Sequence, residues 1–125
     1  MANVFLVGIG GFAGSVLRYL VSGWVQNAAR HPWFPYGTLA VNVIGCLLIG
    51  LVMGLIENRE VFRSETRVLL LIGVLGGFTT FSTFGYETFA LARDGETMKA
   101  FGNVMAQVVL GFFAVWGGHA ASRFM

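Results

Sequence analysis

A run of polar residues interrupts one long apolar stretch of this chain, and it supplies most of the groups that could do chemistry. The run reads Gly76-Gly77-Phe78-Thr79-Thr80-Phe81-Ser82-Thr83-Phe84-Gly85-Tyr86-Glu87. In hydrocarbon, unpaired backbone groups are costly, so irregular backbone survives only where protein buries it or where it lines a cavity. Polar and ionisable groups at membrane depth mark ion or substrate pathways. We therefore interpret the run as the lining of a conduit.

The glycine pair at the start of the run predicts a break in a helix. Glycine costs about 1 kcal/mol relative to alanine inside a helix, and the β-branched Thr79 and Thr80 follow soon after Gly76-Gly77. A break frees backbone carbonyls, which broken helices in transporters use to coordinate small cations. A glycine kink that serves only packing is the alternative.

Two phenylalanines in the run suit an anion. Phe81 and Phe84 are three residues apart and share one face of a helix, with Ser82 and Thr83 on neighbouring directions. Aromatic ring edges are partly positive, so edges turned into a pore would favour an anion weakly. Conduction needs binding that is strong enough for the ion to enter the pore and weak enough for it to leave. The alternative is that both rings are packed or lipid-facing bulk.

Arg18 and Glu87 are charged residues that lie well inside the apolar stretches, and each has more than one possible role. Arg18 lies about two turns from the end of the first stretch, where a guanidinium is costly unless it reaches the interface or a partner. It either draws anions toward a pore mouth or snorkels and bonds to helix-end carbonyls. Glu87 could pair with Arg18, close a pore mouth, or hold hydrogen bonds at an interface.

Polar pairs at helical spacing occur in two further stretches. Thr38 and Asn42 are four residues apart and therefore lie on one helical face, and Asn103 and Gln107 repeat the pattern. Each amide brings two donors into the membrane. Hydrogen bonds between helices are the alternative to pore lining. Together with the run around Phe81, these stripes predict a narrow, uncharged and donor-rich path.

Four apolar stretches must position these groups. The chain has 125 residues, of which 56% are apolar and 11% charged, and this composition is typical of membrane proteins. A helix needs roughly 20 residues to cross the hydrocarbon core, and the stretches at residues 4–25, 36–56, 68–92 and 100–124 are long enough. We expect an all-α membrane protein that forms a single four-helix unit over residues 1–125, with antiparallel neighbouring spans. The first stretch has no basic leader and exceeds the usual apolar region of a signal peptide, so we expect it to be retained.

Lysines and arginines are divided almost evenly between the two sides of the membrane. One side carries Arg59, Arg63, Arg67 and Arg123, and the other carries Arg30, Arg93 and Lys99. Orientation normally follows an excess of these residues on the cytoplasmic side. The chain is therefore expected to insert in both orientations, which would permit an antiparallel dimer, or in one orientation through a weak bias.

At these residues the chain resembles the CrcB/Fluc family of bacterial fluoride channels. The matching motifs are Gly37-Thr38-Leu39-Ala40-Val41-Asn42 and Gly76-Gly77-Phe78-Thr79-Thr80-Phe81-Ser82-Thr83-Phe84. The four-span layout, the chain length, Gly10-Gly11 with Arg18, and Glu87 also fit. The resemblance covers essentially the whole chain.

The resemblance implies a dual-topology, antiparallel homodimer with two separate pores in the bacterial inner (plasma) membrane. The dimer would export fluoride passively and lower cytoplasmic fluoride. The implied partners are a second copy of the chain, fluoride and membrane lipid, with no nucleic acid and no enzymatic role.

The resemblance also implies roles for individual residues. Phe81 and Phe84 would form an aromatic box, with one ring from each subunit at each pore, and Asn42 would contact the ion. The carbonyls of Gly76 and Thr79 would hold a structural Na⁺ at the dimer interface. The polar track would include Thr38, Ser82 and Thr83. In the fourth span, where Asn103 and Gln107 stand, the family varies between hydroxyl and amide residues.

The residues alone indicate a conduit for a small anion and do not separate fluoride from chloride or hydroxide. The main alternative is a small dual-topology multidrug exporter, but that class relies on a carboxylate in its first span, where this chain has Arg18. A structural membrane subunit would explain the glycines and leaves the polar stripes unexplained. Enzyme classes are disfavoured because the sequence contains no catalytic triad, metal cluster or phosphate-binding loop.

Overall fold

The computed structural model describes residues 1–59 and 61–125, and all regular elements in this part of the chain are helices. The elements are α1 (Ala2–Ala29), α2 (Tyr36–Arg59), α3 (Ser64–Arg67), the π-helix η1 (Val68–Leu75), α4 (Gly76–Phe78), α5 (Phe81–Arg93), α6 (Thr97–Ala121) and the 3₁₀ helix η2 (Ser122–Phe124). Four helical stretches are long and apolar enough to cross a membrane: Ala2–Ala29, Tyr36–Arg59, Ser64–Arg93 and Thr97–Phe124. The prediction of four spans is confirmed.

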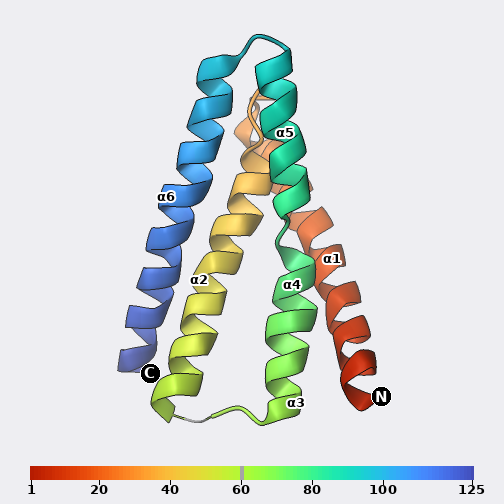
Figure 1. Ribbon diagram of the computed structural model, residues 1–125, viewed down its shortest axis with the longest axis vertical. Helices are drawn as coiled ribbons and strands as arrows, with labels where there is room; N and C mark the ends of the chain where they lie inside the picture. Colours follow the sequence, from red (N-terminus) through yellow and green to blue (C-terminus); the bar gives the residue numbers. More distant parts are fainter. Residues whose placement is uncertain (60) are drawn as a thin grey trace.

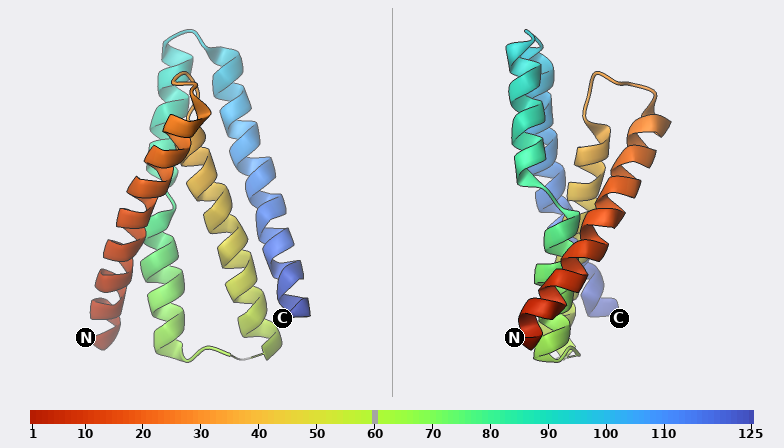
Figure 2. Two further views of the ribbon diagram at one scale, coloured as in Figure 1. Left: turned by 180° about the vertical axis from the view of Figure 1, so that it is seen from behind. Right: turned by 90° about the vertical axis from the view of Figure 1, so that its right-hand side faces the viewer.

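Neighbouring spans run in opposite directions, so both chain termini lie at the same end of the molecule. Figure 1 shows the termini beside the connection from α2 to α3, while the connections from α1 to α2 and from α5 to α6 lie at the other end. The most extensive contact joins α2 and α6, and α1 packs along η1 and α4. Toward the upper end, the α1–α2 hairpin and the α5–α6 hairpin lean apart, as the side view in Figure 2 shows.

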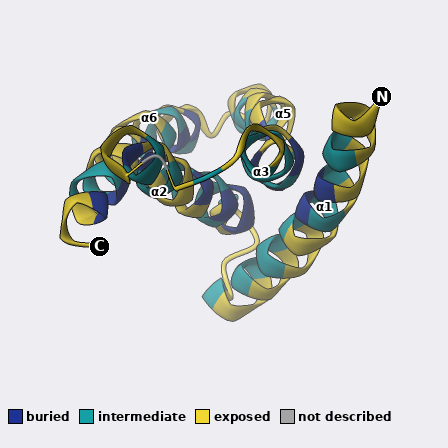
Figure 3. Ribbon diagram, turned by 90° about the horizontal axis from the view of Figure 1, so that it is seen from below, coloured by how far each residue is buried: buried dark blue, intermediate teal, exposed yellow. Residues whose placement is uncertain are grey.

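Large apolar side chains cover the outside of the bundle rather than its centre. Phe12, Trp24, Phe112 and Trp116 are all mostly exposed, whereas the buried apolar residues are few: Val41, Leu75, Phe78 and Ala100. Figure 3 shows the buried residues on the sides of the helices that face one another. In a bilayer this arrangement is expected, because lipid tails solvate apolar side chains as well as other apolar side chains do.

Glycines allow the helix backbones to approach closely. A Cβ atom on Gly14 would overlap the Val74 carbonyl, and one on Gly118 would overlap the Leu47 carbonyl. Small residues are common at such interfaces because close packing, not the hydrophobic effect, drives helix association in lipid. Glycines at these contacts therefore serve packing between helices.

The third span leaves helical conformation at Thr79 and Thr80, not at the glycine pair. Gly76 and Gly77 are part of α4, and the extended backbone begins at Thr79 (φ −86°, ψ 160°) and continues at Thr80 (φ −152°, ψ 116°). The backbone of Gly77 lies so close to that of Gly11 that no side chain fits between them. After the interruption, the hydroxyl of Thr80 accepts a hydrogen bond from the Thr83 amide and so caps the start of α5, as threonine commonly does. The expectation that the glycines themselves break the helix is corrected.

Candidate functional site

Asn42 is the centre of a hydrogen-bond network that joins three elements. Its Nδ2 atom donates to the Thr80 carbonyl (3.0 Å), and its Oδ1 atom accepts from the Thr80 amide (2.8 Å). In a continuous helix the Thr80 amide would donate to the Gly76 carbonyl. The Asn42 side chain therefore holds the extended backbone in place by satisfying both of its polar groups.

Gln107 extends this network to α6 and leaves one donor free. Asn42 Nδ2 also donates to Gln107 Oε1 (3.1 Å). Gln107 Nε2 is buried and has no hydrogen-bond partner among the residues that the structure describes. Both side chains line a cavity of about 390 Å³, together with Cys46, Thr79, Thr80, Phe81 and Phe84. A residue with an unpaired, buried donor therefore lines a cavity that two aromatic rings also line.

The two rings of that cavity contact each other edge to face. The centroids of Phe81 and Phe84 are 5.6 Å apart, and their planes meet at 61°. Phe84 is partly buried, but Phe81 is 82% exposed. In this single chain, the Phe81 ring contacts Phe84 and leaves most of its surface uncovered.

The hydroxyls at the start of α5 gather around Thr80. Its Oγ1 atom donates to Thr83 Oγ1 (2.9 Å) and lies 3.5 Å from Ser82 Oγ. Thr80 is buried, whereas Ser82 and Thr83 are exposed. These hydroxyls form a polar path from the buried interruption to the surface of α5.

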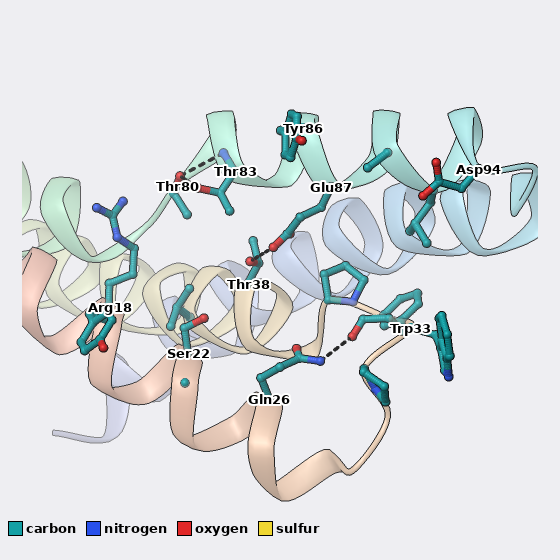
Figure 4. Close-up of a pocket in the computed structure, with 18 of the residues that line it drawn as sticks. Arg18, Ser22, Gln26, Trp33, Thr38, Thr80, Thr83, Tyr86, Glu87 and Asp94 are labelled. Carbon is teal, nitrogen blue, oxygen red and sulfur yellow. Dashed lines mark hydrogen bonds between the residues drawn. The ribbon is translucent and has the colours of Figure 1, made fainter.

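An open cleft of about 790 Å³ lies between the two hairpins, where they lean apart. Figure 4 shows Arg18 near one end of this cleft and Glu87 farther along it. Arg18 Nη1 donates to the Thr79 carbonyl (3.3 Å), so the arginine bonds to the carbonyl at the end of α4. Of the roles expected from sequence, this contact matches the hydrogen bond to a helix-end carbonyl.

Glu87 bonds across the cleft to the first turn of α2. Its Oε1 atom accepts from Thr38 Oγ1 (2.8 Å), and Thr38 is almost fully buried. Glu87 Oε2 is buried without a hydrogen-bond partner in the described part of the chain. Glu87 and Arg18 form no ion pair within residues 1–59 and 61–125, so the pairing considered from sequence is not formed.

Asn103 joins α6 to α5 through a residue that sequence reasoning missed. It is fully buried, and its Nδ2 atom donates to Thr88 Oγ1 (2.9 Å), which in turn donates to the Phe84 carbonyl (2.8 Å). Asn103 and Gln107 thus lie on one face of α6 but bond to different elements. Thr88 lies one residue beyond Glu87, and its helical spacing from Phe84 was the only available signal.

Residues 5–119 match the family described as CrcB-like protein, Camphor Resistance (CrcB). This chain belongs to the CrcB family. One similar protein, named fluoride-specific ion channel FluC 1, from Methanosarcina acetivorans, is 51% identical over 118 residues, which cover 94% of this chain and 88% of that relative. Two CrcB-family relatives named fluoride-specific ion channel FluC, from Geotalea daltonii and Rhizobium meliloti, are each 46% identical over 125 residues and match at nearly full length on both sides.

The CrcB assignment agrees with the helical architecture. Four spanning helices and full-length similarity to membrane channels identify a multi-pass membrane protein. These relatives are named ion channels. The family of this chain is therefore one of channels rather than of enzymes.

Proposed function

We propose that this protein is a fluoride-selective channel in a bacterial inner membrane, through which fluoride leaves the cell passively and cytoplasmic fluoride falls. The observation that carries the proposal is the uncharged polar cluster of Asn42, Thr80 and Gln107, in which Gln107 Nε2 is the unpaired donor, beside the edge-to-face rings of Phe81 and Phe84. Its relatives named as fluoride-specific channels, at 42–51% identity, support the choice of ion.

The chemistry of the cluster suits a small anion that must keep moving. Amide and hydroxyl hydrogens and the positive edges of aromatic rings attract an anion without the deep well that a fixed ammonium group would create. The Nε2 atom of Gln107 is buried without a partner in the part of the chain that the structure describes, and Gln107 lines the neighbouring cavity, which supports a role for this donor in ion contact. We therefore assign ion contact to Asn42, Phe81 and Phe84, and a polar track to Thr38, Ser82 and Thr83, with Gln107 as a further donor.

We propose that the working form is an antiparallel homodimer with two pores, in which each pore takes one ring of the aromatic box from each subunit. The exposed ring of Phe81 supports this arrangement, because a second chain could complete the wall that the single chain leaves open. The division of cations between the two ends, with four on one side and three on the other, supports insertion in both orientations.

Two carbonyl oxygens at the interruption support the proposal of a bound sodium ion. The Thr80 amide bonds to Asn42 instead of the Gly76 carbonyl, and the Thr79 carbonyl accepts only from Arg18 among the described residues. Both oxygens therefore keep lone pairs for a hard monovalent cation. We propose that the Gly76 and Thr79 carbonyls of two subunits hold a structural Na⁺ at the dimer interface, where the ion offsets their partial negative charge.

A small multidrug exporter is not favoured. The family assignment and the relatives' names point to a channel, and helix α1 contains Arg18 and no acidic residue.

The direct test is ion release from liposomes that contain only the purified protein. Fluoride should leave quickly and chloride much more slowly, without ATP or a proton gradient, because donors without fixed cations favour the small anion. Efflux is measured with ion-selective electrodes, and protein-free liposomes are the control. Equal rates for the two anions would overturn the proposed selectivity.

Removing sodium tests the proposed cation. When a large organic cation replaces Na⁺ at constant ionic strength, fluoride efflux should fall and the dimer should dissociate or unfold at lower temperature. The reason is that a carbonyl without a donor, as at Gly76, is costly in a low-dielectric environment unless a positive charge compensates it. Efflux and size-exclusion profiles are the readouts. If neither changes after rigorous sodium removal, the carbonyls hold no functional cation.

A further inference from the structure

The side chain of Gln26, near the end of α1, bonds to three backbone groups of the following linker and helix. Its Nε2 atom donates to the carbonyls of His31 (3.1 Å) and Phe34 (3.0 Å), and its Oε1 atom accepts from the Gly37 amide (3.0 Å). The Gly37 amide belongs to the first turn of α2, where amides have no partner within the helix. One amide side chain thus ties α1, the linker and the start of α2 together.

Close packing against α1 also fixes the position of Gly37. Gly37 is buried, and a Cβ atom at this position would overlap the carbonyl and hydroxyl of Ser22 in α1. The first turn of α2 is therefore fixed relative to α1 by two contacts: the hydrogen bond from Gly37 to Gln26 and the close approach of Gly37 to Ser22. Any shift of this turn moves the next residue, Thr38.

Thr38 matters because it makes the hydrogen bond that crosses the cleft. Within the described residues, its bond to Glu87 is the side-chain hydrogen bond that links α2 to α5. Asn42 ties α2 to Thr80 at the start of α5. Beyond that point the two hairpins lean apart (Figure 2), so little other packing fixes the distance between these helices. Gln26 also lines the cleft itself, as do the linker residues Trp33 and Phe34, and Figure 4 labels Gln26 and Trp33.

We propose that Gln26 is a positioning residue for ion conduction, which places Thr38 against Glu87 and so sets the wall of the cleft that leads to the pore. The inference rests on the proposed function, since it takes the cleft and Thr38 to be part of the anion path. Gln26 acts through Thr38 and does not itself contact the ion in the pore. Loss of its side chain frees the His31 carbonyl in an exposed position where water can replace the donor, and the Phe34 carbonyl keeps its bond from the Tyr36 amide (2.9 Å). The buried Gly37 amide loses its acceptor, so the first turn of α2 is the part that the change disturbs.

The test is a double-mutant cycle in liposomes. Gln26→Met keeps the length of the side chain and removes the hydrogen bonds, and Thr38→Val keeps its shape and removes the hydroxyl. A misplacement of about 1 Å at a reacting site can cost roughly 100-fold in rate, and we expect each variant to lower fluoride efflux about tenfold. If Gln26 acts through Thr38, the double variant should be no slower than the slower single variant.

The matched control is Asn58→Leu at the opposite end of α2. Asn58 also uses a side-chain amide in a contact between elements, donating to Ser122 Oγ (3.2 Å), but it lies far from the cleft. Its loss should leave fluoride efflux unchanged. This control separates an effect on position from a general loss of helix contacts.

Several outcomes would overturn the inference. Wild-type efflux in Gln26→Met, or a double variant whose losses multiply to about a hundredfold, would show that Gln26 does not act through Thr38. If Gln26→Met does not elute as folded protein, Gln26→Asn replaces it, because the shorter amide cannot make all three bonds; wild-type efflux would again reject the role. If the wild-type protein itself passes no fluoride, the proposed function fails instead.

Discussion

The Asn42→Asp variant is expected to lose fluoride conduction by about three orders of magnitude while remaining folded. The carboxylate keeps an acceptor for the Thr80 amide, which Asn42 now bonds at 2.8 Å. It replaces the Nδ2 donor to Thr80 and Gln107 with a negative charge. Two like charges about 4 Å apart repel by roughly 4 kcal/mol at the effective dielectric of a partly hydrated protein, and each 1.4 kcal/mol is about a factor of ten.

The same change at a distant asparagine provides the control. Asn58→Asp introduces an equal charge near the chain termini and should conduct like the wild type, because Asn58 is not part of the donor cluster. Efflux of Asn42→Asp should partly recover when the liposomes are acidified enough to protonate the new carboxyl group. Rapid efflux at neutral pH would show that the ion does not pass Asn42.

Replacing Phe81 or Phe84 with isoleucine is expected to reduce fluoride efflux about tenfold at each site. Isoleucine keeps most of the bulk but has no positive ring edge, and aromatic contacts of this kind are worth about 0.5–1.5 kcal/mol. In the proposed homodimer each pore takes one ring from each subunit, so a single substitution affects both pores and no wild-type pore remains. The measurement is efflux at matched dimer content.

A second aromatic pair in the same chain serves as the control for these substitutions. Phe112 and Phe113 in α6 also meet edge to face, with centroids 5.8 Å apart, and both are largely exposed on the outside of the bundle. Phe112→Ile should therefore leave efflux unchanged. Wild-type efflux in both Phe81→Ile and Phe84→Ile would show that the pair only packs.

Hydropathy was sufficient to predict the four spans but not their ends. The first span was expected over residues 4–25 and forms Ala2–Ala29, and the third was expected over residues 68–92 and forms Ser64–Arg93. The apolar stretch sets the minimum length of a spanning helix. The helix then continues into polar residues because its backbone bonds remain favourable there, which composition does not reveal.

The conformation of the third span depended on tertiary contacts that the sequence does not display. Gly77 stays helical because its lack of a side chain lets α4 approach Gly11 in α1. The chain becomes extended at Thr79 and Thr80, where Asn42 from another helix satisfies the Thr80 backbone. Helix propensity identified the right region, but the partner that decides the position lies 38 residues earlier.

Some site residues could be predicted from the sequence and others could not, again because their partners come from distant parts of the chain. Polar pairs such as Thr38 and Asn42 were evident because amides and hydroxyls are rare inside apolar spans. Gln26 was missed because a polar residue near a helix end is unremarkable on its own, and its backbone partners become visible only when the linker is folded. The bond from Arg18 to Thr79 was one of two open alternatives, and only the packing of α1 against α4 selects it.

The position of both termini at one end of the bundle has a consequence for gene duplication (Figure 1). If two copies of this gene were fused head to tail with a short soluble connector, the second copy would start on the side where the first one ends. Both halves would then have the same orientation. A single polypeptide that reproduces an antiparallel pair would need an additional membrane-crossing segment between its halves, so separate chains that insert in both orientations are the simpler genetic solution.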